Sequence, residues 1–468
     1  MPFKYNPPTR TECKVCEHLH EHDEVESIID SYNGKASSAN NFPFHNWFNF
    51  VLGYSPEFPD YIIRREKISS SDLVFDPFMG SGTTLICCKM LGISSQGIDA
   101  NDFMVEAAKT KLNWNVDVEA IKKYRDDLLK QIEDAYCKYK WDDEIGAAMA
   151  RGQLSLPATH NNGKESYQAY VKDRRPEMLV DKYISDKPLA KVSIIDDVIK
   201  SNLKDGAIKS LFDLALTSII VSVSNVRYGP GFGVIKPKDD KDVLGIFAGK
   251  LNRMISDLES VGGQQRATPS DATLGDARRL SERFERDSVS LMITSPPYPG
   301  DHEYTKHTRL ELIFRGYATN INEFRTIKRR MLRASTTNLY NDDNDREPVL
   351  HFDSIRAATD LIKERLEHDG ATSGFEKLYT KLIWEYFGGM YKTLEECLRL
   401  LKAGGKIALL VSDSHAFKMV HIQTAKILQE IGEKVGFVNT EILPWQLKTT
   451  TSHRYELREN ILILTKPY

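Results

Sequence analysis

The glycine-rich segment 76–84 combines residue types that can bind a cofactor. It reads Asp76-Pro77-Phe78-Met79-Gly80-Ser81-Gly82-Thr83-Thr84, after an apolar run and before a helical pattern. A tight turn at such a position lets a ligand approach the backbone and leaves N–H groups available to an anionic group. Asp99 ends the next predicted strand, where a carboxylate can accept hydrogen bonds from two ribose hydroxyls. A nicotinamide site is the main alternative, but Leu85 replaces the third glycine of its fingerprint.

A second segment, Thr294-Ser295-Pro296-Pro297-Tyr298, suits chemistry at an amino group on an aromatic ring. The lone pair of such an amine is delocalised into the ring, so a site must accept its N–H bonds to localise that pair on nitrogen. The Ser295 hydroxyl and a proline carbonyl can accept them, and two prolines stiffen the loop. Tyr298 offers a face on which a base extruded from a duplex can stack. We therefore take Ser295, Pro296, Pro297 and Tyr298 as candidate catalytic residues.

Together the two segments resemble those of the amino-group DNA methyltransferases, which transfer a methyl group from S-adenosylmethionine (AdoMet) to an exocyclic amine of a base. Segment 76–84 resembles motif I of that family, and segment 294–298 resembles its motif IV. Four further stretches resemble other parts of it: 97–99 motif II, 275–277 motif III, 47–58 motif X, and 404–414 the later core strands. The resemblance covers residues 40–115 and 273–315, with a weaker match from 380 to the end.

The resemblance implies AdoMet as the cofactor and assigns roles to residues at matching positions. Asp276, in motif III, would contact the adenine amino group of AdoMet, and the aromatic stretch that begins at Trp47 would pack around its methionine end. The implied cofactor-binding residues are Asp76, Pro77, Phe78, Gly80, Ser81, Gly82, Thr83, Thr84, Asp99, Ala100, Asp276 and Trp47. No metal is expected to take part in catalysis.

The expected target is the N4 amino group of cytosine in duplex DNA. Serine at the position of Ser295 favours cytosine N4 in this family, whereas adenine N6 enzymes usually carry Asp or Asn there. Methylation at cytosine C5 is disfavoured because it needs a nucleophilic cysteine, in that family after a proline, and none of the six cysteines follows a proline. Three alternatives stay open: N6-adenine methylation, an RNA substrate, and a non-catalytic DNA-recognition subunit.

These sites need a scaffold of alternating strands and helices. A strand at 73–75, the glycine loop, a helix from 83 to about 91 and a strand ending at Asp99 predict the start of a doubly wound α/β sheet, the Rossmann-like core of AdoMet-dependent methyltransferases. A strand at 289–293 leads into the catalytic loop. The closing elements are expected at 406–411 (strand), 422–435 (helix), and 440–447 and 459–464 (an antiparallel hairpin).

We divide the chain into a catalytic core interrupted by two insertions. The expected segments are an N-terminal extension (1–39), the cofactor half of the core (40–115), a largely helical insertion (116–270), the catalytic-loop half of the core (271–317), a polar and basic insertion (318–378), and the C-terminal core strands (379–468). The wording of motif I is that of a branch in which the catalytic loop comes first, yet here the cofactor loop comes first. Target recognition therefore cannot be assigned by analogy, and both insertions are candidates for it.

Three further clusters have two interpretations each. The loop 227–232 could enter a DNA groove, but a structural loop is favoured. The Cys/His cluster at 13–22 could bind zinc, but it lacks the usual spacings of zinc fingers, so we assign no metal to it and leave both interpretations open. A basic run suits contacts with DNA phosphates or, equally, a solvated helix face; it consists of Arg325, Lys328, Arg329, Arg330 and Arg333.

The composition and the N-terminal sequence predict an intracellular protein. The chain has 468 residues, 41% of them hydrophobic, and neither a bilayer-spanning stretch nor an apolar N-terminal signal core is evident. Because the net charge is −3, any DNA-binding face must be locally basic. We expect a cytoplasmic, nucleoid-associated protein that acts on duplex DNA, with no membrane partner. The family adds a cognate restriction endonuclease as a candidate partner.

Overall fold

The computed structural model describes residues 42–139, 166–228, 232–237, 240–300, 302–369, 373–449 and 456–468. The extension predicted for 1–39, with its Cys/His cluster, lies outside these ranges, as do residues 229–231 of the loop at 227–232. No helix within the described ranges is both long enough and apolar enough to cross a membrane.

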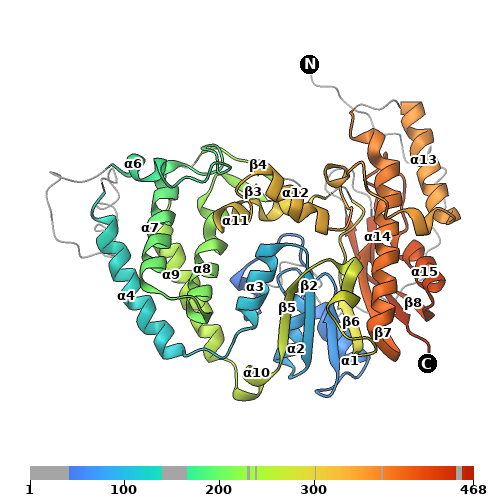
Figure 1. Ribbon diagram of the computed structural model, residues 1–468, viewed down its shortest axis with the longest axis horizontal. Helices are drawn as coiled ribbons and strands as arrows, with labels where there is room; N and C mark the ends of the chain where they lie inside the picture. The colour runs from blue at the N-terminus through green and yellow to red at the C-terminus, as the bar shows by residue number, and fades with distance from the viewer. Residues whose placement is uncertain are drawn as a thin grey trace.

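A seven-stranded sheet forms the centre of the molecule, with the strand order β5-β2-β1-β6-β7-β9-β8 (Figure 1). Its members are β1 (Leu73–Asp76), β2 (Ser94–Asp99), β5 (Ser270–Leu274), β6 (Val289–Thr294), β7 (Leu401–Ser412), β8 (Val438–Thr449) and β9 (Glu456–Thr465). The first five strands in this order are parallel, and β9 runs antiparallel to both β7 and β8. The predicted α/β core with a C-terminal antiparallel hairpin is therefore confirmed.

Alternate residues of the central strands are buried on opposite faces of the sheet. Val74 and Leu291 cluster with residues of α1 and α2, whereas Phe75 and Met292 cluster with residues of α14 and α15. Because helices cover both faces, the central strands β1 and β6 are nearly continuous apolar runs, whereas β2 and β5, towards the edge of the sheet, are more polar. These helices are α1 (Glu57–Arg65), α2 (Thr83–Met90), α14 (Tyr379–Leu400) and α15 (Thr424–Val435). A further helix, α3 (Asp102–Leu112), follows β2.

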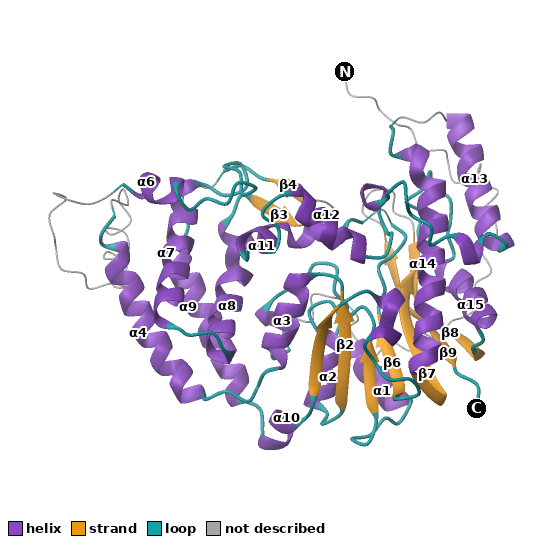
Figure 2. Ribbon diagram, in the orientation of Figure 1, coloured by secondary structure: helices purple, strands orange, loops and turns teal. Residues whose placement is uncertain are grey.

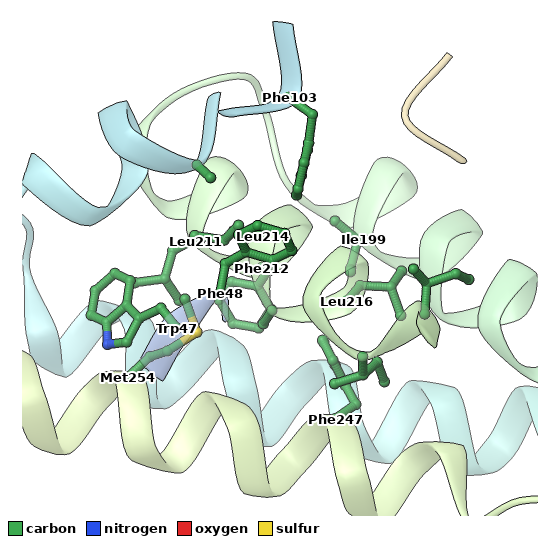
Figure 3. Close-up of a cluster of buried hydrophobic side chains, with 14 of the residues drawn as sticks. Trp47, Phe48, Phe103, Ile199, Leu211, Phe212, Leu214, Leu216, Phe247 and Met254 are labelled. Atoms are coloured by element: carbon green, nitrogen blue, oxygen red, sulfur yellow. The ribbon is translucent and has the colours of Figure 1, made fainter. Parts of the chain in front are cut away.

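The chain between α3 and β5 forms a helical lobe beside the sheet (Figure 2). The helical lobe consists of α4 (Val118–Tyr136), α6 (Tyr167–Lys172), α7 (Asp186–Asn202), α8 (Ala207–Val223) and α9 (Val243–Glu259), followed by the short α10 (Gly263–Ala267). A small hairpin, β3 (Val226–Tyr228) with β4 (Phe232–Val234), joins α8 to α9. Phe212 and Phe247 of the lobe lie in one hydrophobic cluster with Phe48 and Phe103, so the lobe and the cofactor half share a core (Figure 3).

The segment between β6 and β7 supplies α11 (Arg309–Phe314), α12 (Ile321–Arg330), α13 (Asp353–Asp369) and α14. The helix α14 continues through Gly388 and Gly389. Glycine is needed at 388 because another part of the chain lies against the helix there: a Cβ on Gly388 would sit 2.1 Å from the carbonyl oxygen of Asp345. Short 3-10 helices occupy the connections: η3 (His45–Trp47), η4 (Ala277–Glu282), η5 (Tyr304–Thr308), η6 (Thr336–Asn338), η7 (Glu347–Val349) and η8 (Glu376–Leu378).

Candidate active site

A cavity of about 290 Å³ is lined by the loops that follow β1, β2, β5 and β6. These loops leave the carboxyl ends of parallel strands, where ligands of open α/β sheets bind. Twelve of the predicted site residues line this catalytic cavity: Pro77, Phe78, Gly80, Ser81, Thr83, Asp99, Ala100, Asp276, Ser295, Pro296, Pro297 and Tyr298. Asp76, Gly82, Thr84 and Trp47 are not among its lining residues. The fold thus brings the glycine loop and the Ser-Pro-Pro-Tyr loop to one cavity.

The loop between β1 and α2 turns through two glycines with left-handed backbones. Gly80 has a φ of +52° and Gly82 a φ of +89°, values that L side chains rarely adopt. A Cβ on Gly80 would meet no atom of the described residues within 4 Å, whereas a Cβ on Gly82 would lie 3.2 Å from the Cβ of Ala108 in α3. Gly80 therefore presents bare backbone to the cavity, and Gly82 allows α2 to start close to α3.

The Asp99 carboxylate, at the end of β2, is oriented by two backbone N–H groups. Its Oδ2 accepts from Gly80 at 3.0 Å, and its Oδ1 accepts from Asn101 at 2.8 Å. Burial raises the pKa of Asp99 to about 6. Each carboxylate oxygen has a second lone pair, so Asp99 can still accept hydrogen bonds from hydroxyl groups in the cavity.

Asp76 is fully buried and supports the loop from inside the protein. It accepts hydrogen bonds from the Tyr54 hydroxyl at 2.8 Å and from the N–H of Phe78 at 3.0 Å. The Tyr54 hydroxyl also lies 2.6 Å from Thr84 Oγ1. Burial raises the pKa of Asp76 to about 6. Asp76 and Thr84 therefore fix Tyr54, and it is Tyr54 that lines the cavity.

Trp47 lies in the hydrophobic core rather than at the cavity (Figure 3). Its indole N–H donates to Asp257 Oδ2 of α9 at 2.8 Å. Residues 50–55 of the same aromatic stretch line the cavity instead. The prediction that Trp47 contacts the cofactor therefore has no support in the geometry, since a long-range contact with the helical lobe holds this side chain.

Lys111 of α3 joins the stretch before α1 to the glycine loop. Its buried ammonium donates to the carbonyl oxygens of His45 and Phe48, at 3.3 and 3.1 Å, and to Ser81 Oγ at 3.1 Å. Burial lowers the pKa of Lys111 to about 7. One side chain thus links the two segments that border the cavity on this side.

Asp276 lines the cavity with its carboxylate already engaged. Arg278 donates from Nε to Oδ1 at 2.9 Å and from Nη2 to Oδ2 at 2.6 Å. The same guanidinium also pairs with Asp345, which precedes η7. An amino group that approached Asp276 would share the carboxylate with Arg278.

Ser295, Tyr298 and Glu459 form a chain of hydrogen bonds at the cavity. Ser295 Oγ lies 3.1 Å from the Tyr298 hydroxyl, and also 3.1 Å from the carbonyl oxygen of Leu410. The Tyr298 hydroxyl donates to Glu459 Oε1 at 2.9 Å, and Gln446 donates to the other carboxylate oxygen. Burial and the nearby Glu459 carboxylate raise the pKa of Tyr298, so the phenol keeps the proton that it donates.

Sequence reasoning missed the wall that β8 and β9 contribute. Trp445, Gln446 and Glu459 line the cavity, and Glu459 is only 3% exposed. The available signal was a glutamate at the start of an apolar run that reads as a buried strand, because a buried carboxylate requires partners. Which partners it has depends on strand register: Glu459 lies opposite Ser412 of β7 and Gln446 of β8.

Most side chains of the predicted basic run form ion pairs with carboxylates of the protein. Neither a set of free phosphate contacts nor a solvated helix face therefore describes the whole run. Only Arg325 has no carboxylate partner within the described ranges; its guanidinium lies 3.4 Å from the Asn322 side-chain oxygen. The ion pairs of the run are Lys328–Glu303, Arg329–Asp342, Arg330–Asp102 and Arg333–Asp343.

The loop at 227–232 is anchored inward at its described end, since the Tyr228 hydroxyl donates to Glu311 at 2.9 Å. No group of three or more His, Cys, Asp or Glu side chains in the described part of the chain could hold a metal ion.

Known proteins with similar sequences include Type II methyltransferases. A family model for N6/N4 methyltransferases, described as "DNA methylase", matches residues 25–110. The Type II methyltransferase M.BsoBI of Geobacillus stearothermophilus is 24% identical over 466 residues, which cover 91% of this chain and 86% of that protein. The Type II methyltransferase M.AvaI of Nostoc sp. is 22% identical over 454 residues, covering 90% and 84%. Among solved structures, TTHA0409 of Thermus thermophilus shares 18% identity with a TM-score of 0.18, over 42% of this chain and 51% of that one.

Proposed function

The chain belongs to the amino-group DNA methyltransferases, and on this premise we propose that it methylates an amino group of a DNA base. In this proposal it transfers a methyl group from AdoMet to the N4 amino group of cytosine in duplex DNA, after the base has been extruded into the catalytic cavity. The observation that carries the proposal is the position of Ser295 and Tyr298, which face the same cavity as the glycine loop and Asp99.

AdoMet is the methyl donor of this family, and the residues present suit its polar groups. It supplies a methyl group on a positively charged sulfur. In the proposal the exposed backbone at Gly80 faces its methionine carboxylate, and Asp99 accepts hydrogen bonds from its ribose hydroxyls. Tyr54 takes the place in the cavity wall that the sequence suggested for Trp47. Asp276 is retained as a cavity residue whose carboxylate Arg278 orients.

In the proposed mechanism Ser295 accepts an N–H bond of the target amine. The Ser295 hydroxyl has one proton, which the Tyr298 oxygen or the carbonyl oxygen of Leu410 can accept, each at 3.1 Å. The Tyr298 hydroxyl likewise directs its proton to Glu459. With both protons committed, Ser295 Oγ offers a lone pair to the amine and localises the nitrogen's own lone pair for attack.

Glu459 acts in this proposal as a positioning residue, because it works through Tyr298 and Ser295. We expect Glu459→Gln, which keeps the shape and removes the charge, to lower the single-turnover rate constant of methyl transfer about 10- to 100-fold. That range corresponds to the loss of a hydrogen bond to a charged acceptor. Binding of S-adenosylhomocysteine (AdoHcy) should stay unchanged.

A double-mutant cycle separates this role from a structural one. If Glu459 acts through the Tyr298 hydroxyl, then Tyr298→Phe should cause little further loss in the Glu459→Gln background. Additive losses, or a Glu459→Gln variant with the wild-type rate constant, would refute the positioning role.

AdoMet affinity is expected to fall as the pH drops through about 6. Burial raises the pKa of Asp99 to about 6, and only the ionised carboxylate accepts a hydrogen bond at both oxygens. Below this pKa the ionised fraction falls tenfold per pH unit, and the affinity should follow it. Titration calorimetry with AdoHcy between about pH 5 and about pH 8 measures the effect. Asp76 titrates in the same range, so a pH dependence that persists in Asp99→Asn would assign it elsewhere.

Cytosine is the proposed base because the acceptor in the catalytic loop is serine. The test is to incubate the protein with duplex DNA and methyl-labelled AdoMet, digest the product to nucleosides and identify the labelled one by mass. N4-methylcytosine supports the proposal. N6-methyladenine would keep the reaction class and change the base, and label found only in RNA would overturn the DNA assignment.

A role in restriction–modification is part of the proposal, because the similar proteins M.BsoBI and M.AvaI are named as Type II methyltransferases. Under that role a restriction endonuclease of the same specificity would be the partner in function. Host DNA methylated by this chain should then resist cleavage by that nuclease.

A further inference from the structure

We propose that a second cavity, beside the catalytic one, binds the phosphates of the DNA strand that flanks the extruded base. This inference rests on the proposed function and adds to it the surface that contacts the DNA. The second cavity, termed the basic cleft, has a volume of about 590 Å³. It is lined by Met178, Glu303, Thr305, Arg309, Ile321, Phe324, Arg325, Lys328, Arg329, Thr337, Leu339 and Tyr340.

The basic cleft adjoins the catalytic cavity, since Glu303 lines both. It lies where α11 and α12 meet the helical lobe, and Figure 1 shows these helices between the lobe and α14. A base rotates out of a duplex about its own backbone, so the neighbouring phosphates remain at the mouth of the cavity that receives it. A strand with its base in the catalytic cavity must therefore pass close to the basic cleft.

The basic cleft concentrates positive charge in a chain whose net charge is −3. Arg309, Arg325, Lys328 and Arg329 line it, against the single carboxylate of Glu303. Lys328 pairs with Glu303 at 3.0 Å, and Arg329 pairs at 2.9 Å with Asp342, which does not line the cleft. Arg309 and Arg325 have no carboxylate partner in the described part of the chain, so both can neutralise a phosphate.

Aromatic rings hold two of these guanidinium groups in place. Arg309 lies over Phe324 at 5.3 Å from the ring centroid, and its buried Nε has no hydrogen-bond partner among the described residues. Arg329 lies 4.2 Å from the centroid of Tyr340, a ring that Arg333 contacts from 5.1 Å. Stacked guanidinium groups lose little side-chain entropy when they bind an anion, so the cleft is partly preorganised.

Apolar side chains in the cleft favour a ligand that has apolar surface as well as negative charge over a free inorganic anion. Met178, Leu339 and Phe324 line it, and Ile321 at its edge is 62% exposed. A large exposed apolar side chain beside unpaired arginines suits the sugars and base edges of a nucleotide strand, whose phosphates alternate with apolar surface. The occupant we assign is therefore a DNA strand.

The test measures how strongly wild type and variants bind a fluorescein-labelled duplex of mixed sequence, across a range of salt concentrations. One phosphate contact contributes about 0.9 to the slope of log affinity against log salt. Loss of that contact lowers the affinity about 8-fold at about 0.1 M salt. We expect Arg325→Ala and Arg309→Met each to lower both the salt slope and the affinity by these amounts. Arg325→Lys should retain most of the affinity because it keeps the charge.

Arg64→Ala is the matched control, because Arg64 is an exposed arginine on α1 whose side chain is 64% accessible and does not line the cleft. It should leave the affinity and the slope unchanged. AdoHcy binding reports that each variant is folded. If Arg325→Ala and Arg309→Met bind the duplex like wild type, the basic cleft is not the DNA site, although the proposed function stands. A wild-type protein that binds and methylates no duplex would overturn both.

Discussion

Replacing Ser295 with alanine is expected to lower the single-turnover rate constant of methyl transfer by about 100- to 1,000-fold, with AdoHcy binding unchanged. The magnitude is that of removing one hydrogen-bonding group that acts on the transition state. Ser295 Oγ is the acceptor assigned to the target amine, and its removal leaves no side-chain oxygen of the Ser-Pro-Pro-Tyr loop in that role. Rapid-quench measurement with labelled AdoMet and saturating DNA checks the prediction.

Ser295→Asn provides the informative comparison. The asparagine side chain also carries an acceptor oxygen, one bond further from the backbone, so it should recover part of the lost rate if accepting the N–H bond is what Ser295 does. A Ser295→Ala enzyme within a few-fold of wild type would remove Ser295 from the mechanism. Equal losses in alanine and asparagine variants would point to packing instead.

Replacing Gly388 with alanine should lower the free energy of unfolding by about 3 kcal/mol, at the upper end of the usual cost of overpacking. The added Cβ would lie 2.1 Å from the carbonyl oxygen of Asp345 and 2.6 Å from the Cα of Arg346. Both contacts are with backbone, which cannot turn aside as a side chain can. The displaced segment carries Asp345, which pairs with Arg278 and through it with Asp276, so AdoHcy affinity should fall too.

Gly249→Ala is the matched control, because Gly249 lies within α9 and a Cβ there would meet nothing within 4 Å in the part of the chain that the structure describes. This substitution should raise the free energy of unfolding by about 0.5–1 kcal/mol, since alanine loses less backbone entropy than glycine in a helix. Urea denaturation followed by circular dichroism compares the two variants. Equal effects would mean that the approach of Asp345 to α14 is not a tight one.

The fold was predictable wherever local pattern and burial agree. The strands β1 and β6 were predicted within one residue of both observed ends, and the end of β2 at Asp99 was predicted as observed. The sequences of β1 and β6 are nearly continuous apolar runs, as expected of parallel strands that are covered on both faces. The glycine turn identified the β1–α2 connection, where φ is positive at Gly80 and Gly82. The continuation of α14 through Gly388 was harder to predict, because this glycine makes room for the backbone of Asp345, which lies far from it in the sequence.

The side-chain partners of the site were not predictable, because they come from distant segments. Trp47 is held by Asp257, and Asp276 is engaged through Arg278 with Asp345. Sequence spacing carries no information on such pairs. The same holds for Glu459, whose contact with Tyr298 follows from the order of strands rather than from a motif.

The order of the last strands has a consequence for synthesis of the protein. β9 follows β8 in the chain but lies between β7 and β8 in the sheet, and among the described strands β8 pairs with β9 alone. A growing chain therefore carries β8 without a neighbour until β9 has been translated and can insert. Before that moment the cavity also lacks Glu459. A ribosome-bound chain whose β9 has not yet been translated should thus be unable to methylate nearby DNA. Stalling translation before β9 and measuring methyl transfer by the stalled chain would test this.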